Sequence, residues 1–216
     1  VASHSLAAQS AAAVLREGGN AIEAMVSAAA TIAVVYPHMT GIGGDAFWLI
    51  SLPGEKPVAI DACGPAAAAA SIGYYRAQGL TSIPPRGAMA ANTVAGTIAG
   101  WDCALGISRT RCGGRLPLAR LLADSICYAE RGVPVTLSQE LNTRGKRAEL
   151  EGVAGFADRF MPEGQAPLRG ALFAQKKLGA TMQQLAQAGL DDFYHGDLAR
   201  SIAKDLAAAG SPLVLA

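Results

Sequence analysis

The sequence predicts an α/β protein that holds more helix than strand. Three observations support this fold class. One stretch is apolar on every side and ends at a proline, two short apolar runs flank a Pro-Gly turn, and the C-terminal part repeats apolar residues at helical spacing. These segments are Ala24 to Tyr36, Phe47 to Asp61, and Leu198, Ile202 and Leu206. The chain has 216 residues, which is enough for a substantial buried core.

The N-terminal third predicts two consecutive helices. Leu6, Val14 and Leu15 lie at helical spacing among alanines, and the pair Gly18-Gly19 ends that helix. Asn20 opens the second helix, and Glu23 three residues later completes a capping box that satisfies two backbone N–H groups. Because this second helix is apolar all round, we expect it to be buried on all sides in a layer of a larger protein.

The middle of the chain predicts a hairpin after a glycine-rich turn at 41–45. The apolar runs 47–51 and 57–61 are separated by a Pro-Gly turn, which is the pattern of two antiparallel strands. Alanine-rich residues 66–70 are compatible with a loop or a helix, and Pro84-Pro85 marks a connection.

Four further helices are expected in the rest of the chain. Residues 93–105 carry Gly96, Ala99 and Gly100, which suit a helix packed closely against its neighbour. Residues 116–130 form the next, stopped by Arg131-Gly132. Thr181 to Gln184 reads as a second capping box before a short helix that Gly189 closes, and a last amphipathic helix runs to Gly210.

Composition excludes several classes of function. A net charge of +1 argues against nucleic-acid binding, which depends on neutralising phosphates. The 13-residue apolar run 24–36 is shorter than the roughly 20 residues that span a bilayer, so we expect no membrane insertion. Only 16% of the residues are charged while 51% are hydrophobic. We therefore expect a second polypeptide to cover part of this surface, unless Ala-rich helices simply inflate the hydrophobic fraction.

The cysteines and histidines suggest neither a metal site nor a nucleophilic triad. Cys63, Cys103, Cys112 and Cys127 form no CxxC pair and have no histidine at ligand spacing, so we expect no metal and mostly buried, reduced thiols. His195 lies in the run 191–196 with two aspartates, which favours a turn between helices over a metal site. No signal-peptide pattern is visible, which favours the cytoplasm, or the periplasm if a leader has been removed.

The block from Tyr36 to Asp45 is the most distinctive part of the sequence. It runs from helix to strand and lacks the GxGxxG spacing, so it is not a dinucleotide fingerprint, and no GK[ST] follows for a phosphate loop. No GxSxG elbow is present elsewhere. We expect the turn 41–45 to support the fold rather than to contact substrate, and glycines there to be needed for close approach or positive φ.

Five blocks in order cover nearly the whole chain, and each is weak by itself. The blocks are His4-Ser-Leu-Ala with Gly18-Gly-Asn-Ala-Ile-Glu-Ala24, Val35-Tyr-Pro-His with Gly41-Ile-Gly-Gly44, Val94 to Gly100, Leu121 to Pro134, and Asp192-Phe-Tyr-His-Gly196. Taken together, they resemble the large subunit of the gamma-glutamyltranspeptidase family of N-terminal nucleophile hydrolases.

The resemblance implies the four-layer αββα sandwich, with residues 1–216 as the N-terminal part of the large subunit and a small subunit completing the domain. It also implies that one precursor cleaves itself, and that the new N-terminal Thr of the small subunit is the nucleophile while its own amino group is the general base. The nucleophile is then outside this chain, and no cofactor or metal is implied. A dimer of heterodimers is one assembly that this organisation allows.

The substrate prediction depends on a departure from the family pattern. Gamma-glutamyl enzymes carry an Arg after the second strand, in a motif like D-x-R-E-x-A-P, that holds the substrate α-carboxylate. Here Cys63 stands at the Arg position and Gly64 replaces the Glu, while Arg86 near Pro84-Pro85 is a substitute anchor to consider. We therefore expect hydrolysis of a small amide, with oxamate as the best candidate.

Three alternatives stay open beside that expectation. Two lie within the family, namely gamma-glutamyl transfer or glutathione hydrolysis, and cephalosporin (glutaryl) acylase activity. The third is of another class, a non-catalytic Ala-rich binding or scaffold module. Cys63 and Cys127 are expected to be inert to mild thiol reagents in the assembled protein.

Overall fold

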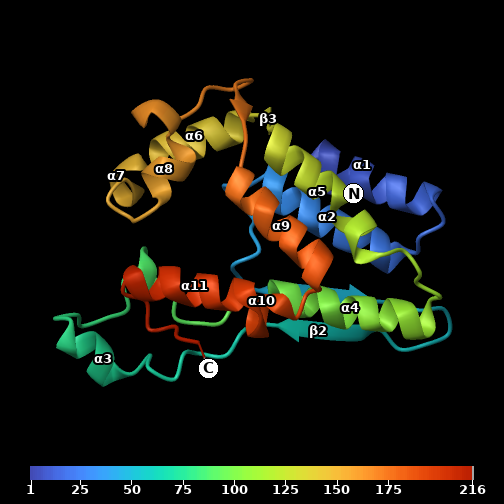
Figure 1. Ribbon diagram of the computed structural model, residues 1–216, viewed down its shortest axis with the longest axis horizontal. Helices are drawn as coiled ribbons and strands as arrows, with labels where there is room; N and C mark the ends of the chain where they lie inside the picture. The colour runs from blue at the N-terminus through green and yellow to red at the C-terminus, as the bar shows by residue number, and fades with distance from the viewer. Residues whose placement is uncertain (216) are drawn as a thin grey trace. The chain divides into compact units, whose positions relative to one another are not determined.

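A computed structural model describes residues 1–215, and it contains the mixture of helices and strands that the sequence predicts (Figure 1). The chain divides into two compact units. Unit 1 comprises 1–63, 95–133 and 172–192, and unit 2 comprises 64–94, 134–171 and 193–216. The prediction that 1–216 form one domain completed by a second subunit stays a prediction.

Unit 1 contains a layer of four helices packed side by side. α1 (Ser5–Arg16) packs on α2 (Ala21–Val35), α2 on α5 (Leu118–Arg131), and α5 on α9 (Lys176–Ala188). The predicted capping box at the start of α2 is confirmed, since Asn20 Oδ1 accepts from the backbone N–H of Glu23 and the Glu23 carboxylate accepts from that of Asn20. As expected, α2 is buried along most of its length, although Met25 is 47% exposed.

The predicted hairpin is also confirmed, and it lies beside α4 in unit 1 (Figure 1). β1 (Ala46–Ile50) pairs antiparallel with β2 (Val58–Ala62), in a register that places Phe47 opposite Asp61. Trp48, Ile50 and Ile60 pack with Ala104 of α4 (Thr97–Arg111). Gly100 allows this close approach, because a Cβ there would lie 2.9 Å from the Cβ of Ala62.

The opposite side of the hairpin is open in this chain. Phe47 and Leu49 are 72% and 76% exposed, and Ala59 beside them is exposed as well. We call the side formed by 45, 47, 49, 59, 61 and 63 the outer hairpin face, because alternate residues of a strand point to the same side.

Unit 2 is built from short helices and long connections. Its elements are α3 (Ile72–Ala77), the 3₁₀ helices η1 (Ala88–Ala90) and η2 (Pro162–Gly164), α6 (Leu137–Gly145), α7 (Arg147–Leu150), α8 (Phe156–Phe160) and α11 (Asp197–Ala208). Hydrogen bonds join distant segments of this unit. The Tyr74 hydroxyl donates to the carbonyl of Gly210 at 2.9 Å, and the Ser211 hydroxyl donates to that of Ala91 at 2.7 Å.

Three remaining elements fall where the chain passes between the units. β3 (Val133–Pro134) and α10 (Asp192–His195) each span a boundary, and β4 (Leu172–Phe173) opens the segment that returns to unit 1. His195 thus lies in a short helical turn before α11, as the sequence indicated. Within residues 1–215, no helix is both long enough and apolar enough to cross a membrane.

Two expectations about elements and thiols are wrong. Thr181 is not an N-cap, because α9 already begins at Lys176 and the Thr181 hydroxyl donates to the carbonyl of Lys177 within the helix. The four cysteines are free, but they are not buried in this chain. Cys63 and Cys103 are exposed, and Cys112 and Cys127 are half-buried.

Candidate substrate-binding site

Cys63 lies directly after β2, at the end of the outer hairpin face. Ala46 at the start of β1 pairs with Ala62 at the end of β2. The residues just outside this pair, Asp45 and Cys63, therefore lie side by side at the end of the hairpin. The backbone N–H of Cys63 donates to Asp61 Oδ1 at 3.0 Å. The carboxylates of Asp61 and Asp45 both raise the pKa of the Cys63 thiol. We call Asp45, Asp61 and Cys63 the hairpin-end cluster.

Hydrogen bonding controls the ionisation of this cluster. The bond from the thiol to Asp61 is the main cause that raises the pKa of Cys63 to about 11, and desolvation and the charges of both aspartates add to it. The same thiol, together with the backbone N–H, lowers the pKa of Asp61. At neutral pH the thiol is therefore protonated.

Thr97 fixes the glycine-rich turn that carries Asp45. Its backbone N–H and its hydroxyl both donate to the carbonyl of Gly44, at 2.9 and 2.8 Å. The side chain also reaches the carbonyl of Asp45, at 3.2 Å. Since Thr97 is buried at the start of α4, the turn is attached to a rigid helix, which positions the Asp45 backbone.

The glycines of this turn do not have the role that we expected. No described atom lies within 4 Å of a Cβ added at Gly41, Gly43 or Gly44, and none of the three has a positive φ. Close approach inside this chain therefore does not require glycine there, and a Cβ at Gly43 would meet no described atom. Whether the turn only supports the fold stays a prediction.

Gly64, in contrast, is required by a backbone contact within unit 2. A Cβ at this position would lie 1.5 Å from the carbonyl oxygen of Val94. The contact is held because the N–H of Val94 donates to the carbonyl of Pro65 at 3.0 Å, and the N–H of Ala67 donates to that of Asn92 at 2.8 Å. The loss of the family's Glu at this position thus has a packing reason.

Arg86 is engaged by an acidic partner of its own unit. Its Nε lies 3.4 Å from Glu149 Oε2, and both side chains are about half exposed. Lys146 also pairs with Glu149, at 2.7 Å. Together these cations lower the pKa of Glu149, with the Lys146 hydrogen bond as the main cause. The idea that Arg86 substitutes for the missing family Arg stays a prediction.

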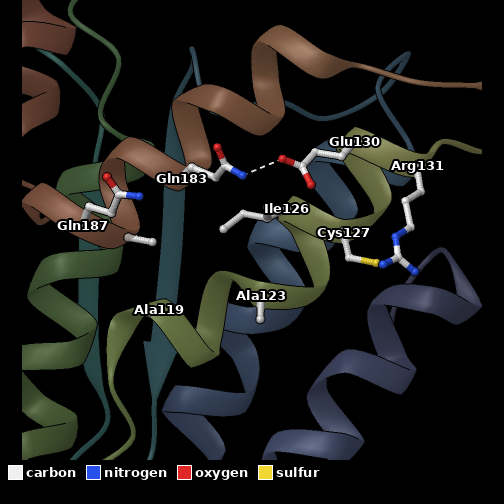
Figure 2. Close-up of a pocket in the computed structure, with 9 residues that line it drawn as sticks. Ala119, Ala123, Ile126, Cys127, Glu130, Arg131, Gln183 and Gln187 are labelled. Atoms are coloured by element: carbon white, nitrogen blue, oxygen red, sulfur yellow. Dashed lines mark hydrogen bonds between the residues drawn. The ribbon is translucent and has the colours of Figure 1, made fainter.

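Neither of two surface hollows is lined by a predicted substrate-binding residue. A groove of about 370 Å³ runs between α5 and α9, where Gln183 Nε2 donates to Glu130 Oε1 beside Ile126 and Cys127 (Figure 2). A second hollow of about 330 Å³ in unit 2 is lined by residues of 144–147 and 164–168. No group of three or more His, Cys, Asp or Glu among residues 1–215 has the arrangement of a metal site.

The sequence prediction missed Asp45 and Asp61 as partners of Cys63. The signal for Asp61 was available, because residues two apart on a strand share a face. Asp45 could be placed only once the register of the hairpin was known, since a shift by one residue would turn it to the other face.

The chain is similar in sequence to one protein family along almost its whole length. The family model described as gamma-glutamyltranspeptidase matches residues 7–216. The chain is 54% identical over 215 residues to an oxamate amidohydrolase proenzyme of Klebsiella pneumoniae, and 38% identical over 216 residues to the glutathione hydrolase-like YwrD proenzyme of Bacillus subtilis. Each match covers 100% of this chain but only 40% of the relative, so the chain spans about two fifths of their length.

Solved structures agree over nearly all of the chain. Gamma-glutamyltranspeptidase from Helicobacter pylori superposes with a TM-score of 0.89 at 30% identity, covering 99% of this chain and 61% of that one. Cephalosporin acylase from Bacillus halodurans gives 0.87 at 31% identity, covering 97% and 39%. The expected N-terminal nucleophile hydrolase fold is thereby confirmed. The chain belongs to the gamma-glutamyltranspeptidase family.

Proposed function

We propose that this chain is the large-subunit part of an autoprocessed amidohydrolase that hydrolyses a small amide, with oxamate as the best candidate substrate. The observation that carries the proposal is the 54% identity to the oxamate amidohydrolase proenzyme over the whole chain. Identity to proteins named glutathione hydrolases is lower, at 34% for Pseudomonas aeruginosa and 28% for Escherichia coli.

The proposed chemistry uses a nucleophile supplied by the small subunit. The hydroxyl of its N-terminal Thr attacks the amide carbon, and the α-amino group of the same residue takes the hydroxyl proton. The C–N bond then breaks as the amide nitrogen takes up this proton and leaves as ammonia. An ester now joins the acyl group to the Thr hydroxyl oxygen. Water cleaves the ester in the second half, which for oxamate releases oxalate.

Cys63 supports a substrate other than a gamma-glutamyl compound. A guanidinium can bind a carboxylate with two parallel hydrogen bonds, whereas a protonated thiol offers one weak donor. In this protein Asp61 and Asp45 raise the pKa of that thiol, so it carries no positive charge and stays a neutral donor. The runner-up activities are gamma-glutamyl transfer or glutathione hydrolysis and cephalosporin (glutaryl) acylase activity, supported by the named relatives and the acylase structure. The scaffold alternative has no such support.

The outer hairpin face supports the proposed small subunit from the same precursor. Exposed Phe47 and Leu49 leave a strongly apolar surface on a sheet, of the kind that another layer covers in packed proteins. We further propose a cytoplasmic enzyme that assembles as a dimer of heterodimers. Cell fractionation and light scattering of the matured protein test these two points.

The decisive experiment assays the matured two-subunit enzyme with oxamate and glutathione side by side. Ammonia release from oxamate at a kcat/KM well above that for glutathione hydrolysis is the expected result. Efficient glutathione hydrolysis without oxamate turnover would refute the proposal. In that case Arg86→Ala separates the alternatives, because loss of glutathione hydrolysis in this variant would identify Arg86 as the substitute anchor.

A further inference from the structure

We propose that His4 is a pH-sensitive cap of α1, which holds the first turn of that helix while its imidazole is neutral and releases the turn when the ring is protonated in mildly acidic solution. The proposal concerns a conformational change within unit 1. It goes beyond the activity proposed above and does not depend on it.

His4 satisfies three backbone N–H groups at the start of α1. Its Nδ1 accepts from the N–H of Leu6 at 3.2 Å, and its carbonyl oxygen accepts from those of Ala7 and Ala8 at 3.1 and 3.3 Å. The first N–H groups of a helix have no acceptor inside the helix, so a side chain usually supplies one. Asn, Asp, Ser and Thr are the common caps, and unlike them histidine titrates close to neutral pH.

The cap requires that Nδ1 of His4 carries no proton. The Leu6 N–H can only donate, so Nδ1 must offer its lone pair, and the proton of the neutral ring is then on Nε2. Protonation turns Nδ1 into a donor that faces another donor. It also places a positive charge at the positive end of the helix dipole. The charged ring and the capping bond therefore exclude each other.

The surroundings of His4 consist mainly of rings. α2 packs on α1, and the charged or titratable residues of α2 and of the turn 36–40 after it are Glu23, Tyr36 and His38. The ring centroids of His4 and Tyr36 are 6.4 Å apart, and those of Tyr36 and His38 are 4.3 Å apart. Glu23 lies in the first turn of α2, at the other end of that helix, where it accepts from the N–H of Asn20.

Burial sets the direction of the pH dependence. It lowers the pKa of His4 below the usual value of 6.5, and it lowers that of His38 as well. Above pH 6.5 His4 is neutral whether α1 is closed or open, so the cap contributes fully. As the pH falls below 6.5, the open form binds more protons than the closed form. The contribution of the cap is therefore lost progressively, down to the lowered pKa of His4.

The opening is confined to the first turn of α1. The Ser10 hydroxyl donates to the carbonyl of Leu6 at 3.1 Å, and the buried Thr31 hydroxyl donates to Ser10 Oγ at 3.1 Å. These bonds attach the second turn of α1 to α2 without using His4. Ala7 of the first turn is fully buried, so its opening exposes a contact inside the helix layer of unit 1.

Hydrogen exchange of the full-length matured protein tests the proposal. Mass spectrometry with fragmentation gives the protection of the N–H groups of Leu6, Ala7 and Ala8, each relative to an unstructured peptide at the same pH. We expect protection to fall about fivefold from pH 8 to pH 5, the factor that corresponds to a cap worth about 1 kcal/mol. Residues 11–16 of the same helix are the internal reference, and their protection should not change.

Three variants separate His4 from its neighbours. His4→Asn should keep high protection at both pH values, because an amide oxygen accepts the Leu6 N–H without titrating. His4→Ala should give low protection at both. His38→Gln is the matched control, since it removes the other imidazole beside Tyr36 and should retain the pH dependence of α1.

Equal protection of the first turn at pH 8 and pH 5 in the wild type would overturn the proposal. An undiminished fall in His4→Asn would overturn it too, and if that fall also disappeared in His38→Gln, the pH dependence would belong to His38. Failure of the protein to hydrolyse oxamate would count against the proposed function alone, because hydrogen exchange does not require turnover.

Discussion

Glu23 provides the sharpest test of how this chain is held together. The side chain is 2% exposed, and its carboxylate accepts three backbone hydrogen bonds. Oε2 accepts from the N–H of Asn20 at 2.8 Å, and Oε1 accepts from those of Arg115 and Leu116 at 2.7 and 2.8 Å. One carboxylate thus caps α2 and also anchors the segment that leads into α5.

We expect Glu23→Ala to lower the free energy of unfolding by about 3 kcal/mol. Loss of a helix cap costs about 1 kcal/mol, and each buried N–H left without a partner costs about 1–3 kcal/mol, less where water can reach it. Glu23→Gln should cost about 1–2 kcal/mol, because one oxygen still accepts while the new NH₂ group faces backbone donors.

The measurement is urea unfolding of the full-length proenzyme, followed by circular dichroism. Glu17→Ala is the matched control, since Glu17 also makes two hydrogen bonds, both to Arg120 at 2.6 Å, but in an exposed ion pair. Exposed pairs contribute little to stability, so its unfolding midpoint should stay near that of the wild type. If the two variants shift the midpoint equally, the argument from burial is wrong.

Three further predictions address individual positions. Gly64→Ala should prevent maturation of the proenzyme, which a gel would show as missing subunit bands. Gly106→Ala should mature normally, because no described atom lies within 4 Å of the added Cβ, and its free energy of unfolding should rise by about 0.5–1 kcal/mol. Cys63 should stay inert to iodoacetamide at neutral pH, as expected above, and its labelling should begin only as the pH approaches about 11, because Asp61 favours the protonated thiol. Asp61→Asn should move this rise to lower pH, and rapid labelling of the wild type near neutral pH would contradict the prediction. Gln139→Met should leave the melting temperature unchanged or raise it. The reason is that Gln139 is 1% exposed and neither polar atom of its amide has a hydrogen-bond partner among the described residues. A fall of several degrees would show that the amide is hydrogen-bonded.

Local patterns were enough to predict most elements of unit 1. The capping box at Asn20 and Glu23 depends on residues three apart, and the hairpin depends on a turn between two apolar runs, so both could be read from short stretches. The second capping box failed at Thr181, although it had the same spacing, because the preceding residues 176–180 continue the helix. A capping pattern therefore predicts a helix start only where the residues before it cannot be helical.

Contacts between distant segments were decided by the tertiary structure alone. Nothing in the sequence links Glu23 to Arg115, 92 residues away, or Gly64 to the Val94 carbonyl. The candidate site divides in the same way. Cys63 was identified because it stands at the Arg position of the motif that the family resemblance implies, whereas the place of Asp45 beside it depends on the register of the hairpin. Register and long-range approach arise from the packing of whole elements, which no short stretch of sequence specifies, whereas caps and strand alternation arise from neighbours along the chain.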